Sequence, residues 1–401
     1  MLSRSLSKHS ALSNVLLLLC ASSTYAAGGD IAEDLQVHGF IAQGVIDVSG
    51  SDFVNDEQEI STELTEIGFN ASYQLNNDFR LTGQVVYLEG GNRYSAGARL
   101  DYALLDWNFY DSESWSANLY LGRFKNNHWL YSSTRDIPFA RPSIILPQAI
   151  YFDGLRDVAV GGDGYAIKIS HSSDNYGDFD FNFSRGSSNI SDKQKDIIAG
   201  PEPTGGLEHD LDLQASLYWR PNFSQWRFGM SLLDSDFHYL QGENDGFTNG
   251  DFTYQFYTVN ALFEGEKLEF AMEILQQRLA IDNFYFTGFA MDNIGQGFYT
   301  QFRYKFTNNL VGLIRYDDFY SNKDDKKGHE LEETTGLPNY FGYQTDRTIG
   351  LAYDIDTNLR VNVEYHWVNG TARLTPLVTP NPELNDSEDW QMWAVQLMYW
   401  F

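Results

Sequence analysis

Basic and acidic residues lie close together in one segment of the chain. Its charged side chains are Arg123, Lys125, Arg135, Arg141 and Arg156 on the basic side, with Asp136, Asp153, Asp157 and Asp163 on the acidic side. Opposite charges at such spacings can form ordinary salt bridges. Held across a narrow gap, they would instead create a transverse field that orients dipolar solutes and screens ions. This segment is the first candidate for a selective site.

The connecting part of this segment, residues 126 to 163, is unusually apolar. It contains Ile137, Phe139, Ile144, Ile145, Leu146, Ile150, Tyr151 and Phe152, with Pro138, Pro142 and Pro147 among them. Side chains this apolar must pack against something, and prolines lower the entropy cost of holding one shape. We expect the segment to fold back onto the inner side of its scaffold. A cap above an opening and a subunit contact are the alternatives.

A second set of charged residues alternates with apolar residues in extended stretches: Arg80, Lys168, Arg315, Arg360 and Glu364. Successive side chains of a strand point to opposite faces. These charges would therefore share one polar wall, and we expect that wall to face residues 126 to 163.

Catalytic chemistry is not indicated. The histidines are scattered along the chain, and no Gly-x-Ser-x-Gly nucleophile motif occurs. Cys20, the only cysteine, lies near the N-terminus. His366 alternates with Glu364 on one face, where hydrogen bonding within a wall is its expected role. We predict neither an enzyme nor a cofactor or metal site.

The elements that position these groups are stretches of alternating apolar and polar residues. Ile67, Phe69 and Ala71 point one way between polar neighbours, and the turn 76–78 leads into a second such stretch. Sixteen strands are predicted, near residues 35–48, 63–75, 79–88, 100–110, 115–125, 164–171, 178–185, 209–220, 226–234, 253–263, 267–277, 297–306, 310–319, 344–354, 359–367 and 390–401.

The connections between these strands alternate between short and long. Turns such as 264–266 and 307–309 are short, whereas 126–163 and 320–343 are long, and aromatic residues gather beside the short turns. Short turns on one rim and long loops on the other are typical of a transmembrane barrel whose two ends are periplasmic. Aromatic girdles are expected at the headgroup level, although aromatics also favour strands in general.

Membrane insertion by helices is not predicted. Beyond the N-terminus no window approaches the ~18 consecutive apolar residues that a membrane helix needs, and the mean hydropathy is -0.39. A closed barrel then remains, because an open sheet edge has no partners in lipid. Arg4 and Lys8, an apolar run at 15–21 and a small-x-small pattern ending at Ala26 predict a signal peptide over 1–26. Residues 27–401 would form the barrel domain.

The formal net charge is -28, which argues against nucleic-acid binding. Much of the acidic excess lies in the predicted outer loops, for example at Glu330, Glu332 and Glu333. Such clusters are usually solvated surface. The alternative is that their carboxylates hold divalent cations that bridge to lipopolysaccharide phosphates.

The final stretch, residues 391–401, alternates apolar and polar side chains and closes on Phe401. With the signal peptide and the alternating loop lengths, it makes the chain resemble the sixteen-stranded Gram-negative porin superfamily. A block beginning Gly122-Arg123-Phe124-Lys125 also resembles porin-like proteins of marine gammaproteobacteria. The resemblance implies that the third long loop narrows the lumen, that the barrel is a homotrimer, and that Phe401 is read by the barrel-assembly machinery.

We therefore predict an all-β protein, a sixteen-stranded antiparallel transmembrane β-barrel in the outer membrane, with its long third loop folded into the lumen. The expected function is passive diffusion of small hydrophilic solutes and ions. The pore constriction is assigned to the charged residues of 123–157, and the lumen wall to the second charged set. An anion-preferring channel, or a sealed barrel that acts as a receptor or adhesin, is the alternative.

Overall fold

The structure is a computed structural model, and it describes residues 34–56, 59–94, 96–156, 161–374 and 387–401. The predicted signal peptide lies outside these residues. The strands are β1 (Leu35–Ser49), β2 (Thr65–Gln74), β3 (Phe79–Glu89), β4 (Gly97–Asp111), β5 (Trp115–Lys125), β6 (Gly161–Ser173), β7 (Gly177–Ser187), β8 (Gly206–Arg220), β9 (Trp226–Leu240), β10 (Gly250–Glu264), β11 (Leu268–Asp282), β12 (Ala290–Lys305), β13 (Leu310–Tyr320), β14 (Tyr343–Asp356), β15 (Leu359–Gly370) and β16 (Asp389–Trp400).

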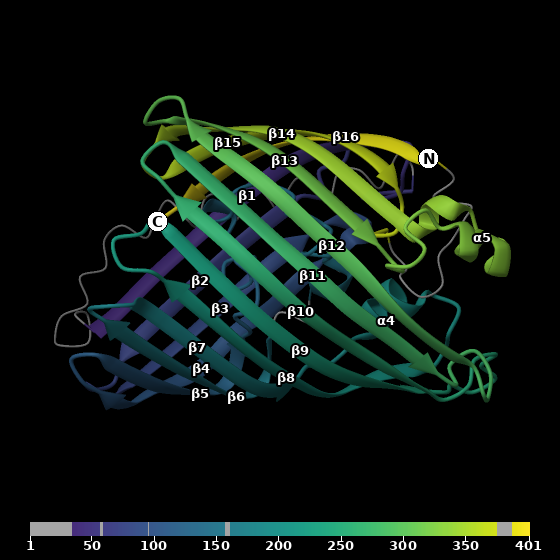
Figure 1. The fold of residues 1–401 in the computed structure, drawn as a ribbon, viewed down its shortest axis with the longest axis horizontal. Helices are drawn as coiled ribbons and strands as arrows, with labels where there is room; N and C mark the ends of the chain where they lie inside the picture. Colours follow the sequence, from purple (N-terminus) through teal and green to yellow (C-terminus); the bar gives the residue numbers. More distant parts are fainter. Residues whose placement is uncertain (1–33, 57–58, 95, 157–160, 375–386) are drawn as a thin grey trace, which may run out of the picture.

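Each strand pairs with its neighbours in the chain, and β1 pairs with β16 to close the sheet into a barrel (Figure 1). All pairings are antiparallel, and the closing pair runs from Phe40 opposite Trp400 to Ser49 opposite Gln391. Closure leaves no unpaired edge, as a barrel in lipid requires. The sixteen-stranded antiparallel barrel expected from the sequence is therefore confirmed.

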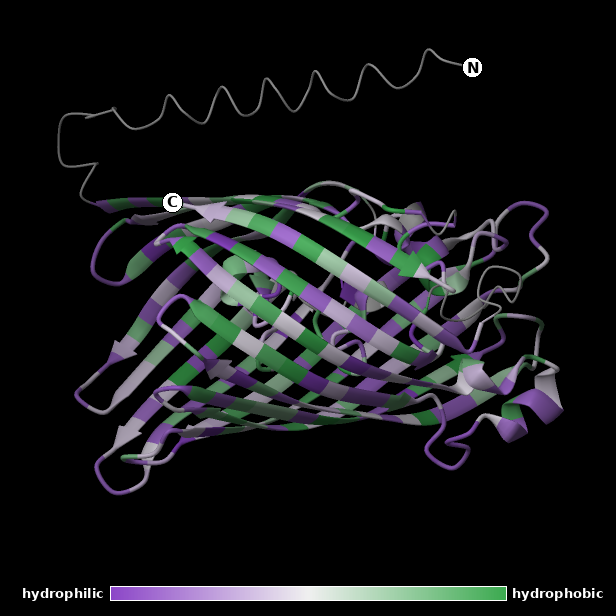
Figure 2. Cartoon of the chain, turned by 90° about the horizontal axis from the view of Figure 1, so that it is seen from above, coloured by the Kyte–Doolittle hydropathy of each residue, from purple (hydrophilic) through white to green (hydrophobic). Residues whose placement is uncertain are grey.

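Apolar and polar residues alternate along the strands, visible as alternating green and purple bands (Figure 2). The exposed face carries large apolar side chains such as Phe69, Leu81 and Ile314, whereas the opposite face carries buried polar ones such as Glu66, Gln301 and Glu364. Polar groups inside and apolar groups outside are the inverse of a soluble protein and typical of a transmembrane barrel.

Strands β8 to β12 are longer than the sequence predicted, because their polarity inverts toward the long loops. There the outward face becomes polar, with Asp234 and Asp236 on β9, while the inward face becomes apolar, with Leu233 and Phe237. Spanning the bilayer takes ~9–11 residues of a tilted strand, and these strands have 15 or 16. We infer that their outer ends continue beyond the apolar layer.

In the parts of the chain that the structure describes, the helices are short and lie among the connections. They are α4 (Asp192–Ala199), α5 (His329–Thr335) and the 3₁₀ turns η1 (Gly91–Arg93), η2 (Pro138–Ala140), η3 (Asp153–Leu155) and η4 (Asn339–Gly342). The Ser191 hydroxyl caps α4 by accepting a hydrogen bond from Gln194 N. Helix α5 lies beyond the strand ends, at the opposite end of the barrel from the C-terminus (Figure 1). Among the described residues, no helix is long and apolar enough to cross a membrane.

Candidate channel and the segment that borders it

The segment that follows β5, residues 126–156, is almost entirely buried. On one side it packs against the apolar inward face of β8 to β12, where Trp129 stacks on Phe256 with ring centroids 5.4 Å apart. Glu273 of β11 fixes this side by accepting hydrogen bonds from Leu130 N at 3.1 Å and from the Tyr151 hydroxyl. One wall carboxylate thus binds two separate parts of the segment.

The other side of the segment packs against β1, β15 and β16. Ile144 and Ile145 join an apolar cluster with Ile46 and Met392, which face inward from β1 and β16. The carboxylate of Glu364 accepts hydrogen bonds from the backbone N–H groups of Ile144 at 2.5 Å and Ile145 at 3.1 Å. Buried donors are costly when unpaired, so Glu364 fixes the path of the chain at this point.

Arg315 of β13 completes this attachment. Its guanidinium donates to the Ser143 hydroxyl at 3.0 Å and to Ile145 O at 2.9 Å. On the neighbouring strand β12, Gly297 allows a close approach of the segment, because an added Cβ would stand 2.6 Å from Ala149 O. The segment is therefore held by contacts with strands that lie around much of the barrel.

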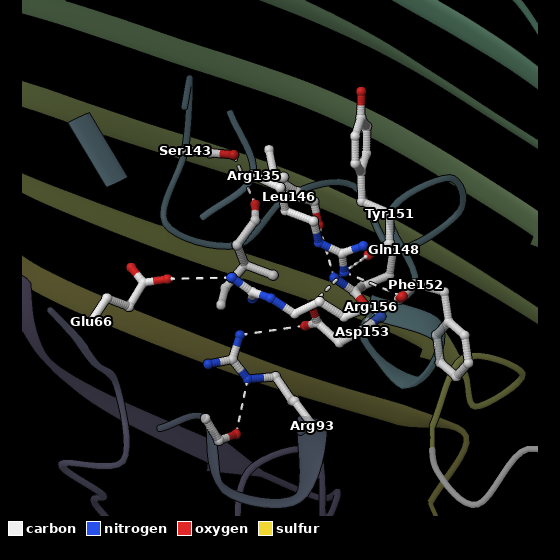
Figure 3. A network of polar contacts seen from close by, with 12 residues as sticks. Glu66, Arg93, Arg135, Ser143, Leu146, Gln148, Tyr151, Phe152, Asp153 and Arg156 are labelled. Atoms are coloured by element: carbon white, nitrogen blue, oxygen red, sulfur yellow. Dashed lines mark hydrogen bonds and ion pairs between the residues drawn. The ribbon is translucent and has the colours of Figure 1, made fainter. Parts of the chain in front are cut away.

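Ion pairs within the segment, and one with Arg93 of η1, stabilise its conformation (Figure 3). Arg135 donates to Tyr151 O and to Asp153 Oδ1, both at 2.9 Å, and Arg93 of η1 reaches Asp153 Oδ2 at 3.4 Å. Burial disfavours the charged carboxylate, but Arg93 and Arg135 outweigh it and hold the pKa of Asp153 below its ordinary value. Asp153 therefore stays ionised at neutral pH.

Two further arginines form ion pairs, one within the segment and one with β2. Arg141 makes a two-pronged contact with Glu66, at 2.9 Å and 2.5 Å, with both side chains at most 5% exposed. Arg156 pairs with Asp136 and lies 3.9 Å from Glu66. Bidentate arginine–carboxylate pairs such as Arg141–Glu66 fix the geometry of the contact as well as stabilising it.

Three cavities form a row along β3 to β9. An upper cavity of about 330 Å³ lies near Ala96 and Asn189, at the end with the long loops. A middle cavity of about 390 Å³ includes Thr82 and Ser184 in its lining. A lower cavity of about 270 Å³ lies near Asp178 and Arg220, beside the short turns. Together they extend from one end of the barrel to the other.

Neighbouring cavities share lysines. Lys125 lines both the upper and the middle cavity, and Lys168 lines both the middle and the lower one. The Lys125 ammonium lies 2.8 Å from Asp101 and 2.7 Å from Asp136. Because Asp136 belongs to the 126–156 segment and Asp101 to β4, this triad bridges the segment and the wall at the junction of two cavities.

A break in the strand alternation brings Asp101 to this junction. The pairing of β3 with β4 shifts between Gln84 and Val85, so that Asp101 is the extra residue of a bulge. Its carboxylate accepts a hydrogen bond from the inward-facing Gln84 at 2.7 Å. Regular alternation would put Asp101 on the same face as Ala103, so the sequence pattern does not reveal that Asp101 lies at this junction.

The charged residues selected from the sequence fall into three groups. Arg135, Arg141, Asp153 and Arg156 are buried in ion pairs within the segment or with β2, and Arg315 and Glu364 bind its backbone. Lys125, Asp136, Arg80 and Lys168 line the cavities, and Arg123 and Arg156 also contribute to the lining of the upper one. Arg123 pairs with Asp163 at 2.6 Å where β5 and β6 approach the long loops, and Arg360 pairs with Asp354 at 2.6 Å. Asp157 lies outside the described residues.

Burial corrects the detailed interpretation of the first group. Arg135 and Arg141 are 1% and 5% exposed and belong to ion pairs, so they are not charges facing an open gap. The sequence could not separate these two possibilities, because both need opposite charges close in the chain. Their carboxylate partner on β2, Glu66, and the second carboxylate anchor, Glu273, were not selected from the sequence either.

Phe401 lies at the seam where the barrel closes. Its backbone exchanges hydrogen bonds with Gly39, with N–O distances of 3.0 and 3.1 Å, and its side chain is 42% exposed. Within the residues that the structure describes, no group of histidine, cysteine or carboxylate side chains is arranged to hold a metal ion.

Neither a protein-family model nor a curated protein sequence matches this chain. Solved structures do match. The chain is similar to outer-membrane OmpT of Vibrio cholerae, with 14% identity over 92% of this chain and 97% of that chain, at a TM-score of 0.56. It is similar to the anion-selective porin from Comamonas acidovorans, with 10% identity over 92% and 99% of the two chains and a TM-score of 0.56.

Salmonella typhi OmpF is also similar, with 14% identity over 92% of this chain and 97% of that chain and a TM-score of 0.56. Identities this low show the fold alone. The structural neighbours include outer-membrane porins, so the resemblance seen in the sequence is confirmed at the level of the fold.

Proposed function

We propose that this protein is an outer-membrane porin through which small hydrophilic solutes and ions diffuse passively, without a catalytic step or a cofactor. The observation that carries the proposal is the row of three cavities, joined at Lys125 and Lys168, between the 126–156 segment and the wall. The lining is rich in hydroxyl, amide and charged groups, which suit water and polar solutes.

In this proposal the 126–156 segment lies in the lumen and narrows it. A barrel of sixteen strands encloses more space than wall side chains can fill. The two apolar clusters support an attachment of the segment to β8–β12 on one side and to β1, β15 and β16 on the other. The route for solutes is then restricted to the side of β3 to β9.

A preference for anions is the finer proposal, and the charges of the route favour it. The three cavities are lined by eight basic residues, Arg80, Arg99, Arg123, Lys125, Arg156, Lys168, Arg220 and Arg227, and by five acidic ones, Asp101, Asp106, Asp136, Asp178 and Asp180. The whole chain has 27 basic and 55 acidic residues. The excess of basic residues is therefore local to the route, whereas the protein as a whole carries a net negative charge.

Reconstitution in a planar bilayer tests both levels of this proposal. We expect stepwise ohmic currents, and a reversal potential in a potassium chloride gradient that shows preferred chloride passage. Arg80→Ala should shift this potential toward potassium, whereas Arg185→Ala, on an exposed residue outside the three cavities, should not. Ohmic current without chloride preference would remove only the finer proposal. Silence would overturn the channel and favour a sealed receptor or adhesin.

The surroundings of the channel are proposed from the sequence and the fold together. We propose export by a signal peptide over residues 1–26, insertion by the barrel-assembly machinery through the strand that ends at Phe401, and residence in the outer membrane among lipid and lipopolysaccharide. A homotrimer is the proposed assembly; one similar solved structure is described as a trimer form of Vibrio cholerae OmpT.

A further inference from the structure

The middle cavity contains an ammonium group without a partner. Lys168 projects from β6 into this cavity, and in the part of the chain that the structure describes its side chain has no hydrogen bond or ion pair. Most other basic side chains that line the proposed route have acidic partners. Arg80 lies 3.3 Å from Asp106, and Lys125 lies between the carboxylates of Asp101 and Asp136. A half-buried cation without a counter-ion is an attractive position for an anionic group.

A second donor in the same cavity also lacks a partner. Gln214 of β8 is 1% exposed, and its Oε1 accepts a hydrogen bond from the Ser184 hydroxyl at 3.1 Å. Among the described residues its Nε2 has no hydrogen-bond partner. Buried amide groups are normally paired. Since Lys168 and Gln214 line one cavity, a single oxygen-rich group bound there would supply acceptors for both.

The rest of the cavity lining suits the hydroxyl-bearing part of a solute. Hydroxyl groups of Thr82, Tyr102, Tyr120 and Ser133 and the amide of Asn182 belong to it, and Leu104 adds an apolar patch. Asp106 is the only carboxylate among the described residues that line it, and it is already held by Arg80 and by Asn118 at 2.6 Å. The cavity of about 390 Å³ lies within the range of about 300–1,000 Å³ that is usual for small-molecule sites.

We infer that the middle cavity is a saturable binding site for small hydroxylated carboxylates, with Lys168 and Gln214 holding the carboxylate. The inference rests on the proposed channel and adds a solute class to it. A solute bound there lies on the route between Lys125 and the lower cavity, so its occupancy must reduce the passage of other ions.

Current block by a matched pair of probes tests the site. Galacturonate and galactose have nearly the same size and hydroxyl groups, and only galacturonate carries a carboxylate. With the full mature protein in a planar bilayer, galacturonate should reduce the chloride current to a saturating level at concentrations at which galactose leaves it unchanged. Lys168→Met should raise the half-blocking concentration by about tenfold, the loss expected for one charge-assisted hydrogen bond.

Two further variants make the test specific. Lys305→Met changes an exposed lysine at the end of β12, outside the three cavities, and should leave the block unchanged. Gln214→Glu keeps the side-chain volume but places a negative charge beside the carboxylate, so it should abolish the block while current persists. An ohmic current that galacturonate does not block, or blocks equally in the Lys168→Met protein, would overturn the site and leave the channel intact. A protein without current would overturn the channel itself.

Discussion

Replacing Arg141 by methionine should release the 126–156 segment from β2. The substitution removes the two-pronged contact with Glu66 but keeps most of the side-chain volume. Glu66 is 1% exposed and would be left with Gln396 at 3.1 Å and Arg156 at 3.9 Å as its remaining partners. The variant therefore tests whether this ion pair holds the segment in place.

The expected magnitude follows from burial. Removing one partner of a buried ion pair costs about 3–5 kcal/mol, because the other charge stays buried without compensation. The two remaining partners of Glu66 place the expected cost at the lower end, about 3 kcal/mol. This changes the equilibrium between the attached and the released segment by a factor of about one hundred.

Single-channel recording measures this equilibrium directly. We expect the Arg141→Met protein to show frequent excursions to a larger conductance, each of them a release of the segment, where the unsubstituted protein is quiet. Arg185→Met, on an exposed arginine of β7, is the matched control and should remain quiet.

The double variant Glu66→Met with Arg141→Met separates attachment from overall damage. Replacing a buried pair by apolar side chains of similar volume is often neutral or stabilising, so the quiet current should return. If the single variant is as quiet as the unsubstituted protein, the ion pair does not hold the segment and our reasoning about its attachment is wrong.

Three other outcomes are expected. Burial, with the nearby charge of Arg135, lowers the pKa of His128 to about 3, so the attached segment requires a neutral ring. The attached state of the segment is therefore destabilised as the pH falls below the ordinary histidine pKa of ~6.5, by about 2 kcal/mol between pH 7 and pH 5. Current excursions should increase on acidification, and His128→Leu should remove this increase. Deletion of Phe401 should reduce the share of the protein recovered in outer-membrane fractions, whereas Phe223→Ala in a short turn should not, and equal recovery would argue against a role in assembly. Mass spectrometry of the purified protein should place Ala27 at its N-terminus. A purified protein that still begins with Met1 would refute cleavage after Ala26.

The barrel could be predicted because its signal is repeated. Alternation over each strand and alternating connection lengths gave the same answer sixteen times. The strand ends failed where polarity inverts: on β9 the prediction ended at residue 234, whereas the strand continues to Leu240. A stretch with an apolar inward face packed on the segment no longer resembles a lipid-facing strand.

The site could be predicted only by region. Composition identified residues 126–163 as packed and charged, and Lys125, Asp136 and Lys168 do line the cavities. Partner choice was beyond the sequence, because Arg141 pairs with a carboxylate 75 positions away in the chain. The inward turn of Asp101 depends on one extra residue in β4, which no periodic pattern reveals.

Thiol blocking of single-cysteine variants tests the course of the channel most directly, because Cys20, the only cysteine, falls in the predicted signal peptide. Ser184→Cys places a thiol in the lining of the middle cavity. Gln301→Cys places one on β12 at a position that is 0% exposed. We predict that a charged methanethiosulfonate reagent reduces the single-channel current of the Ser184→Cys protein and leaves that of the Gln301→Cys protein unchanged. Block at residue 301 without block at residue 184 would contradict a route along β3 to β9.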